Sequence, residues 1–340
     1  MSERNHTVPV LGITMGDPAG IGPEVVLKAL MEPEVQEICY PVVIGDGSVL
    51  ERVSQKLGLE VELNSISASS LMSQGWTTSS ACDKRQINLI DLATLHPDDI
   101  RVGEVQPQAG KAAVEYIKTA THLAMSGLLA GIVTAPINKA AMNLAGHAYA
   151  GHTELLQALT KARRVAMLLY LGHLGISHVT THVSMRDACQ LVTRERVLEV
   201  LRLTNAVALK LNQADKPLAV AGLNPHSGEG GLFGNEEEEA ITPAICQAQA
   251  EGINVVGPLP PDTVFLKAHR GVYDFVIAMY HDQGHIPAKL LGFETGVNVT
   301  LGLPIIRTSV DHGTAFDIAN QGIADCQSMV EAIRLATRLA

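Results

Sequence analysis

The sequence lacks several features that mark particular classes of protein. Its 340 residues contain no run of about 18 apolar residues, which a membrane-spanning helix would need. The opening stretch, MSERNHTVPV, has no apolar segment of the kind found in secretory signal peptides. Basic residues number 25 against 35 acidic ones, and no Lys/Arg-rich run occurs. We therefore expect neither a membrane nor a nucleic acid as partner.

Cysteines are few and widely spaced. The sequence has five of them and no CxxC pair. This spacing predicts reduced thiols in a cytoplasmic protein, and it favours small buried core residues over a redox or metal site. The residues concerned are Cys39, Cys82, Cys189, Cys246 and Cys326.

The composition and the order of apolar segments indicate a folded α/β protein. Hydrophobic residues make up 46% and charged residues 18% of a chain long enough for two domains. Short β-rich runs such as VPVLGITM, PVVIGD and KPLAVAGLN alternate with longer helical patterns. This alternation predicts a largely parallel sheet.

Two polar segments interrupt this pattern. The Ser-rich stretch Ser65–Lys84 predicts a surface loop or an edge hairpin. The acidic run Glu236–Glu239 could hold a cation. We favour the solvated first turn of a helix, where carboxylates offset the positive end of the helix dipole.

The segment Ile13–Leu30, ITMGDPAGIGPEVVLKAL, predicts a strand, a glycine-rich turn and a helix that begins near Pro23. Exposed N–H groups at such a helix start favour anions. The spacing matches neither GxGxxG nor a P-loop. An ordinary structural turn is the alternative.

Three histidines each follow a predicted strand: His182, His226 and His281. Functional sites in parallel α/β sheets collect where strands end. Three neutral imidazoles suit Zn²⁺, Co²⁺ or a similar ion. Each histidine taken singly is more often a structural residue, and their spacing matches no local metal motif, but three at the same kind of position are a better signal.

The stretch AMYHDQGHIP contains a further histidine, His285, four residues after His281. On a helix this spacing would place both rings on one face. Gly284 and Pro287 argue against a regular helix that begins at His281. We therefore predict that His281 is the ligand and that His285 is a neighbour or a surface residue.

Polar and basic side chains could form an anion site. Lys289 and Arg307 lie in apolar, glycine-rich surroundings, where a charge needs a partner and a phosphate would supply one. Asn298 lies between them in sequence. The motif AGHTELL adds His152 and Thr153, although Thr153 could instead be a helix N-cap.

The motifs together resemble one enzyme family, the 4-hydroxythreonine-4-phosphate dehydrogenases of vitamin B6 synthesis, with the related 4-phospho-D-threonate/4-phospho-D-erythronate dehydrogenases. The resemblance covers nearly the whole chain and is carried by GDPAGIGPE, TAPINK, GHTE, GLNPHSGEGG, GPLPPDT, AMYHDQG and GLPIIRTSVDHGTAFDIA. Both ends are also similar to the isocitrate/isopropylmalate dehydrogenases.

The resemblance implies a two-lobed α/β fold with largely parallel sheets and an active site in the inter-lobe cleft. We place the cofactor-side lobe at residues 1–130 plus 296–340. The lobe for metal, substrate and dimerisation is then residues 131–295.

The resemblance also implies residue roles, in a homodimer whose sites take residues from both subunits. One divalent ion (Zn²⁺, Co²⁺, Mn²⁺ or Mg²⁺) would lie on His182, His226 and His281. The substrate would be bound by His152, Thr153, Lys289, Asn298 and Arg307. The NAD(P)⁺ pocket would include His312, Gly313, Thr314, Ala315 and Asp317.

The general base is left open among Asp262, Asp282 and Lys289. Asp282 has an alternative role, which is to orient a metal-binding histidine.

The implied activity is oxidation at C3 of a 4-phosphorylated 3-hydroxy acid, followed by loss of CO₂. The motif TMGDPAG is more similar to the phospho-threonate branch of the family. It therefore favours 4-phospho-D-threonate or D-erythronate as substrate, which would give dihydroxyacetone phosphate. Ala150 before GHTE departs from the family pattern and leaves the substrate open. The alternative substrate is 4-phosphooxy-L-threonine of pyridoxal phosphate biosynthesis, which would give 3-amino-2-oxopropyl phosphate. Rival classes are a metal-dependent phosphatase and a phospho-sugar sensor.

Overall fold

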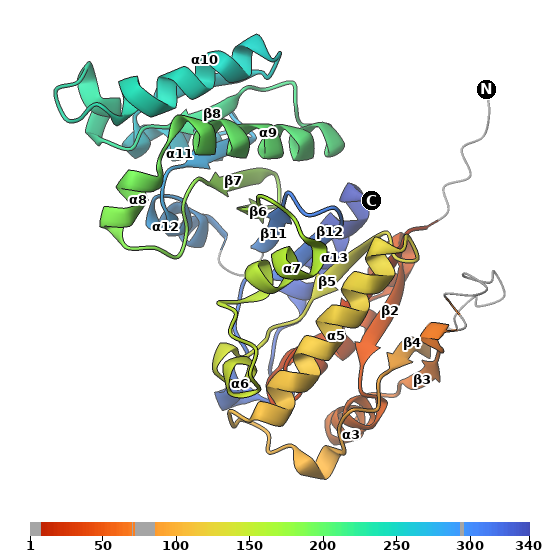
Figure 1. Ribbon diagram of the computed structural model, residues 1–340. Helices are drawn as coiled ribbons and strands as arrows, with labels where there is room; N and C mark the ends of the chain where they lie inside the picture. Colours follow the sequence, from red (N-terminus) through yellow and green to blue (C-terminus); the bar gives the residue numbers. More distant parts are fainter. Residues whose placement is uncertain (1–7, 70, 72–85, 293–295) are drawn as a thin grey trace, which may run out of the picture. The chain divides into compact units, whose positions relative to one another are not determined.

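A computed structural model describes residues 8–69, 71, 86–292 and 296–340, and its helices and strands alternate along the chain (Figure 1). The predicted α/β class is confirmed. Among the described residues, the pairs β1–β2, β1–β5, β12–β5, β2–β4, β3–β4, β10–β7, β10–β8 and β8–β9 are parallel, and the pairs β11–β6 and β6–β7 are antiparallel. Among the described residues, none of the helices combines the length and the apolar character needed to span a bilayer.

The chain forms two compact units. Unit 1 comprises Met1–Arg163, Leu303–Arg338 and Ala340, and unit 2 comprises Arg164–Gly302 and Leu339. These limits differ from the predicted lobe boundaries near residues 130 and 295. Residues 131–163 belong to unit 1 because β5 pairs with β1 and β12, whereas β11 pairs with β6 in unit 2.

Unit 1 has strands in the spatial order β3 (Glu62–Ser65), β4 (Gln86–Asp91), β2 (Tyr40–Gly45), β1 (Val10–Thr14), β5 (Gly131–Thr134) and β12 (Ile306–Val310). Its α-helices are α1 (Gly22–Met31), α2 (Pro33–Ile38), α3 (Gly47–Leu57), α5 (Pro107–Met125), α6 (Lys139–Leu144), α7 (His152–Thr160) and α13 (Gln327–Leu339). Helix α5 packs along β1, β2 and β5. Short 3₁₀ turns are η1 (Pro97–Asp99) and η4 (Phe316–Ile318).

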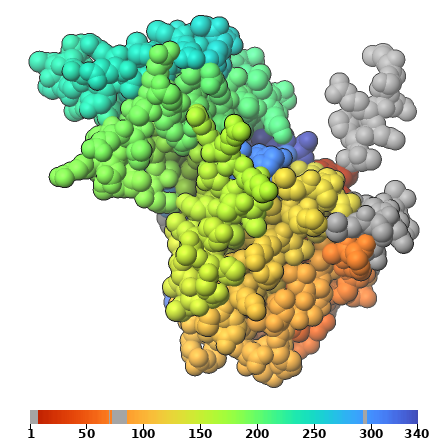
Figure 2. Space-filling model, in the orientation of Figure 1, coloured from red at the N-terminus to blue at the C-terminus, as the bar shows by residue number. Residues whose placement is uncertain are grey.

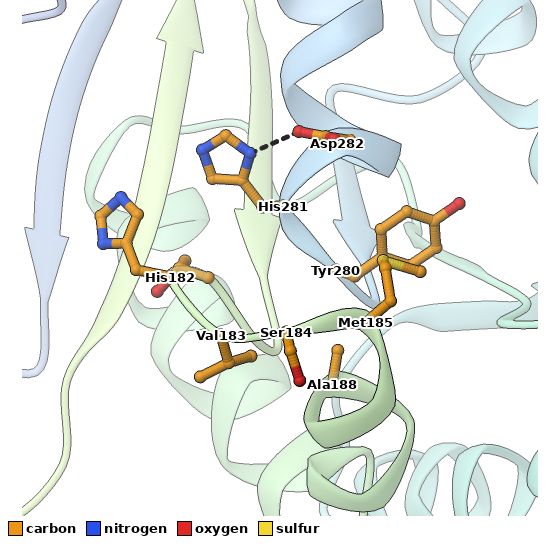
Figure 3. Close-up of a pocket in the computed structure, with 9 residues that line it drawn as sticks. His182, Val183, Ser184, Met185, Ala188, Tyr280, His281 and Asp282 are labelled. Carbon is orange, nitrogen blue, oxygen red and sulfur yellow. Dashed lines mark hydrogen bonds and ion pairs between the residues drawn. The ribbon is translucent and has the colours of Figure 1, made fainter.

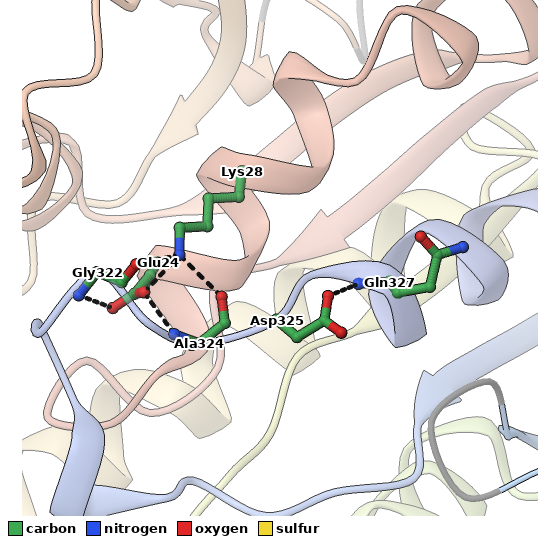
Figure 4. A network of polar contacts seen from close by, with 6 residues as sticks. All are labelled: Glu24, Lys28, Gly322, Ala324, Asp325 and Gln327. Carbon is green, nitrogen blue, oxygen red and sulfur yellow. Dashed lines mark hydrogen bonds and ion pairs between the residues drawn. The ribbon is translucent and has the colours of Figure 1, made fainter.

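A partly buried ion pair holds helix α1 of unit 1 in place (Figure 4). The fully buried Glu24 accepts hydrogen bonds from Lys28 Nζ at 2.8 Å and from Ala324 N at 3.0 Å. Lys28 Nζ also donates to the carbonyls of Gly322 and Ala324, each at 2.8 Å. The helix that follows GDPAGIGPE is thereby tied to the loop that follows HGTAFDIA.

Unit 2 has strands in the spatial order β11 (Val297–Leu301), β6 (Ala166–Leu171), β7 (Leu174–His178), β10 (Phe275–Ala278), β8 (Leu218–Ala221) and β9 (Val255–Leu259). Its α-helices are α8 (Met185–Leu191), α9 (Arg194–Lys210), α10 (Thr242–Ala250), α11 (Pro261–His269) and α12 (His281–Gly292). A 3₁₀ segment, η2 (Pro225–Glu229), and a π-helix, η3 (Glu237–Ile241), complete it.

Strand alternation decides which side chains of unit 2 meet which helix. Ser177 faces α9, where its hydroxyl lies 2.7 Å from that of Thr204. Its neighbour Ile176 points the other way, into a core that includes Val264 of α11 and Ala288 of α12. His178 follows by the period of two and therefore faces α12.

The acidic run Glu236–Glu239 is only partly exposed to solvent. Glu238 and Glu239 are exposed as predicted, but Glu237 is only 3% exposed, so a solvated acidic turn is wrong at that position. The four described cysteines are free thiols. Cys39 is buried as predicted, but Cys326 is half-buried and Cys189 and Cys246 are exposed, so the predicted core position is wrong for these three. The excursion Ser65–Lys84 lies largely outside the described residues.

Candidate functional site

The register of β7 and β10 brings two of the predicted metal ligands together. His178 pairs with Ala278, and the parallel ladder continues through Val179 N to Ala278 O at 2.8 Å and Thr180 N to Met279 O at 3.2 Å. His182 and His281 follow within a few residues, and their ring centroids lie 5.6 Å apart. Two histidines nearly 100 residues apart in sequence thus become neighbours because their strands are parallel.

Both histidines line a pocket of about 380 Å³, a volume within the range of small-molecule sites. It is lined by Thr181, His182, Val183, Ser184, Met185, Ala188, Tyr280, His281 and Asp282 (Figure 3). Asp282 Oδ1 lies 2.7 Å from His281 Nδ1. This contact leaves Nε2 of His281 for a ligand, as in the carboxylate–histidine–metal arrangement.

Two further histidines lie behind the pair. His285 Nδ1 is 3.1 Å from His178 Nε2, and the rings of His281 and His285 are stacked at 3.7 Å between centroids. Burial lowers the pKa of His178 to about 3 and the pKa of His285 to about 4, so both are neutral. His285 is a neighbour of His281, as predicted, but a surface position is wrong because it is 8% exposed.

Helix α12 begins at His281, so the prediction against a helix there is wrong. Gly284 is needed for packing, since a Cβ at this position would lie 2.3 Å from His178 Nε2. Pro287 lies inside the helix. Packing of α12 across β6, β7 and β10 outweighs the weak helix propensities of these two residues.

His226 lies in a different loop of unit 2. It is exposed, follows β8, and its ring is 6.4 Å from that of Phe233. The space-filling view shows this green-to-teal part of the chain at the surface of unit 2 (Figure 2). Within the described ranges, no three His, Cys, Asp or Glu side chains gather closely enough to hold a metal ion. One chain therefore brings together two of the three expected ligands.

Unit 1 contains a compact group of cationic side chains. Arg307 of β12 is 3% exposed, and its Nε and Nη2 donate to Thr134 Oγ1 at 3.1 and 2.8 Å. Burial lowers its pKa to about 9, so the guanidinium is still charged near neutral pH. Burial, followed by the nearby charges of Arg307 and Lys139, holds the pKa of His152 well below its usual range.

This group contains two of the residues predicted for the anion site, Arg307 and His152. His152 Nε2 is buried and has no hydrogen-bond partner in the described part of the chain. Lys139 was not among the predicted residues, although it ends the motif TAPINK. Thr153 lies in the first turn of α7, whose N-cap is Gly151, so the N-cap alternative for Thr153 is wrong.

The other two predicted substrate residues lie in unit 2. Lys289 is exposed, which contradicts the expectation that its charge is enclosed by apolar residues. It lies on the same face of α12 as His281 and His285, because the three are spaced four apart. Asn298 is half-buried in β11, opposite Leu169 of β6.

The candidate bases lie near the histidine pair. Asp262 is exposed in the first turn of α11 and lines a second pocket together with Tyr280 and Asp282. Tyr280 and Asp282 also line the pocket of His182 and His281. Asp262 is therefore adjacent to the histidine site, whereas Asp282 contacts His281 directly.

The glycine-rich turn after β1 packs against two other motifs in unit 1. Asp17 N donates to Pro136 O at 2.8 Å, and Ile21 N donates to Thr314 O at 2.9 Å. A Cβ on Gly20 would lie 2.7 Å from Thr314 O, so this close approach requires glycine. Burial raises the pKa of Asp17 to about 6.

The predicted cofactor segment follows β12. His312 Nδ1 lies 3.1 Å from Gly313 O, and Gly313 has open space where a Cβ would be. Ala315 has a left-handed φ of 39°, and Asp317 is exposed in η4. The exposed Asp317 is one polar group of this turn. The carbonyl of Thr314 accepts a hydrogen bond from Ile21 N of the glycine-rich turn after β1.

A family model described as Pyridoxal phosphate biosynthetic protein PdxA matches residues 37–336. The chain belongs to the PdxA family. D-threonate 4-phosphate dehydrogenase of Salmonella typhimurium (strain LT2) is 48% identical over 333 residues, covering 97% of this chain and 98% of the relative. The corresponding enzyme of Pectobacterium atrosepticum is 46% identical over 331 residues, covering 97% and 99%.

Solved structures of PdxA-family enzymes have the same fold as this chain. The crystal structure of 4-hydroxythreonine-4-phosphate dehydrogenase from Klebsiella pneumoniae superimposes with a TM-score of 0.88 at 46% identity, covering 98% of this chain and 99% of that one. Because such relatives are dehydrogenases matched over almost their full length, this PdxA-family chain is an oxidoreductase.

Proposed function

We propose that the chain oxidises the C3 hydroxyl of D-threonate 4-phosphate with NAD(P)⁺. The resulting 3-keto acid then loses its carboxyl group as CO₂ to give dihydroxyacetone phosphate. The hydroxyl proton passes to a base and the C3 hydride to the nicotinamide. The observation that carries the proposal is the His182–His281 pair with Asp282 behind it, in a chain whose curated relatives are D-threonate 4-phosphate dehydrogenases.

The histidine pair fits a divalent metal ion, because both rings line one pocket and His281 keeps Nε2 for a ligand. We propose that His226 of a second copy completes the site in a homodimer. Supporting features are the exposure of His226 and the exposed apolar side chains that follow it, Leu232 at 70% and Phe233 at 45%.

When bound, the metal ion would supply Lewis-acid polarisation of the C3 oxygen, and NAD(P)⁺ would accept the hydride. Asp282 fixes the ring orientation of His281. The base that takes the hydroxyl proton is then Asp262 or Lys289.

Anion binding falls to the cationic group of unit 1. Arg307, with its charge retained in a buried position, and the adjacent His152 suit the substrate phosphate or carboxylate. Thr153 can add a hydroxyl. Within unit 2, Lys289 and Asn298 are the residues proposed for substrate binding. His312, Gly313, Thr314, Ala315 and Asp317 are proposed for the cofactor. The free thiols are consistent with a cytoplasmic enzyme.

A second candidate is 4-phosphooxy-L-threonine, favoured by the names of the solved structures at 46–47% identity. The two substrates differ at C2, where one carries a hydroxyl and the other an ammonium group. D-threonate 4-phosphate is favoured because the curated relatives at 46–48% identity carry that name.

The test is formation of NADH or NADPH from both phosphorylated acids, compared as kcat/KM. We expect the D-threonate compound to be preferred, and turnover to be lost when metal is removed by a chelator. His281→Ala should lose the metal dependence of turnover and remain folded. Turnover that survives chelation would refute the metal site. Binding of substrate with no cofactor reduction, in metal-loaded protein, would refute the enzymatic reaction and favour a sensor.

A further inference from the structure

The His226 loop of unit 2 is built around a buried carboxylate, that of Glu237. Its Oε1 accepts hydrogen bonds from Leu223 N and Asn224 N, each at 2.8 Å. Its Oε2 accepts one from Asn224 Nδ2 at 2.9 Å. A Cβ on Gly228 would lie 2.8 Å from the same Oε2, so the loop closes around the carboxylate.

The π-helix η3 places Glu237 in this position. An ordinary acidic first turn would project its carboxylates into solvent, as Glu238 and Glu239 do. The wider π turn begins at Glu237, which is 3% exposed. Such π segments occur frequently at functional sites.

The loop needs this support because its backbone is strained. His226 has φ 54° and Ser227 has φ 57°, both in the left-handed region that disfavours residues other than glycine. Each such residue costs about 1–2 kcal/mol. The three hydrogen bonds to a charged acceptor offset this cost.

A second side chain, Gln283, links this loop to the turn that carries His281. Gln283 is 8% exposed, and its Oε1 accepts a hydrogen bond from Met279 N at 2.6 Å. Its Nε2 donates to Gly222 O at 2.8 Å. Gln283 thereby continues the β10–β8 pairing beyond the last residues that pair as strands, Ile277 and Val220. Gly222 in turn adjoins the carboxylate, because a Cβ there would lie 3.0 Å from Glu237 Oε1.

We infer that Glu237 and Gln283 are positioning residues that hold the His226 loop in fixed relation to His281. The inference rests on the proposed function, in which both histidines bind divalent metal ions. Neither residue touches the metal. Gln283 fixes the turn of His281 to Gly222, and Glu237 fixes the shape of the loop from Gly222 to Gly228. In the proposed dimer each chain supplies His281 to its own site and His226 to the other, so the same contacts serve both sites.

The experiment titrates full-length, metal-stripped protein with Co²⁺ and follows the visible d–d absorption, which reports ligand number and geometry without turnover. The variants are Glu237→Ala, Glu237→Gln and Gln283→Met. Glu239→Gln is the matched control, because the same chemical change is made at an exposed position. His226→Ala tests whether the third histidine contributes at all. Thermal unfolding and size-exclusion chromatography check that each variant is folded and has the oligomeric state of the parent.

We expect Glu237→Ala and Gln283→Met to weaken Co²⁺ binding by about tenfold or more and to change the absorption spectrum, the effect typical of losing support around metal ligands. Glu237→Gln should fall between Glu237→Ala and the parent, because its amide oxygen can still accept from Leu223 N and Asn224 N. Glu239→Gln should match the parent. If Glu237→Ala does not fold, Glu237→Gln and Gln283→Met decide the question.

Two negative outcomes are distinguishable. Folded Glu237 and Gln283 variants with the parent's Co²⁺ affinity and spectrum, beside a His226→Ala variant that binds weakly, would overturn the positioning role and leave the metal site intact. A parent protein that shows no Co²⁺ absorption, or a His226→Ala variant identical to it, would instead overturn the proposed metal site.

Discussion

The two units bury different kinds of ionisable side chains beside their parallel strands. Unit 1 buries a cation, Arg307 of β12, and a carboxyl group, Asp17, which follows β1. Unit 2 collects imidazoles, His178, His182, His281 and His285. Burial acts on both sets, but it removes the charge of the buried histidines and leaves the guanidinium charged. The contrast shows how burial beside similar sheets can leave a charged guanidinium in one unit and neutral imidazoles in the other.

We therefore expect that a substitution in unit 1 impairs substrate turnover without changing the metal affinity of unit 2. A substitution that affects only one of these two quantities is the sharpest test. Arg307→Met should lower kcat/KM by about 10²–10³-fold, because a buried charge-assisted contact to an anionic substrate is lost. Co²⁺ affinity should stay that of the parent. Steady-state kinetics and a Co²⁺ titration measure the two quantities. Arg101→Met, at an exposed arginine, is the control. Equal losses of kcat/KM and metal affinity would erase the distinction.

The pH dependence of unfolding should distinguish the units by sign. The pKa of His178 is about 3 in the folded protein against 6.5 for the free group, so the unfolded chain binds an additional proton below 6.5. Stability from this group is full above 6.5 and is lost as pH falls towards 3. Between about pH 6.5 and 4.5 the loss should approach about 2.7 kcal/mol. His178→Asn should lack that loss in urea unfolding of metal-free protein. A stability difference between parent and variant that does not change over this range would contradict the assignment.

Asp17 in unit 1 should show the opposite sign. Its pKa is about 6 when folded against 3.8 for the free group, so the folded state holds a proton that the unfolded chain has lost. Stability therefore falls as pH rises through this window. Between about pH 4.5 and 6 the change should be about 1.5 kcal/mol. Asp17→Asn should abolish it, so the variant gains stability relative to the parent as pH rises. The same series of urea unfolding measurements tests this. A variant that gained stability relative to the parent as pH falls would contradict the assignment.

The smallest expected effect concerns packing inside the histidine group. Gly284→Ala places a methyl group against His178 Nε2, and the cost of overpacking exceeds the gain in helix propensity by about 1 kcal/mol. The penalty should shrink in a His178→Ala background, where the obstacle that remains is Ile176 Cγ2, 2.9 Å from the added Cβ. A double-mutant cycle of unfolding free energies measures the coupling. Equal penalties in both backgrounds would show that His178 is not the obstacle.

Much of the fold and part of the site could be predicted from local patterns. Apolar runs alternating with helical segments indicated parallel strands, and each of His182, His226 and His281 was correctly expected after a strand. The helix at His281 was predicted wrongly, because Gly284 and Pro287 were weighed by propensity alone. Glu237 was assigned to a solvated turn for a similar reason, since a π segment leaves no clear trace in four consecutive glutamates.

The residues that prediction missed are those defined by distant contacts. His178 meets His285 across 107 positions of sequence, and Gln283 meets Gly222 across 61. Lys139 is recognised as a candidate site residue only because its charge lies near His152 in the folded chain. Such pairs share no spacing rule, because the separation between strands depends on the lengths of the helices that connect them.

The sequence by itself determined the α/β class, the family and the strand ends at which chemistry should occur. Hydrophobic periodicity and local motifs suffice for these, since they depend on neighbouring residues. The tertiary structure alone decided that β7 and β10 pair so that His182 meets His281, that Gly284 makes room for His178, and that Glu237 points inward. Register, close packing and burial depend on which segments come together in space, and burial in turn decides which side chains keep their charge.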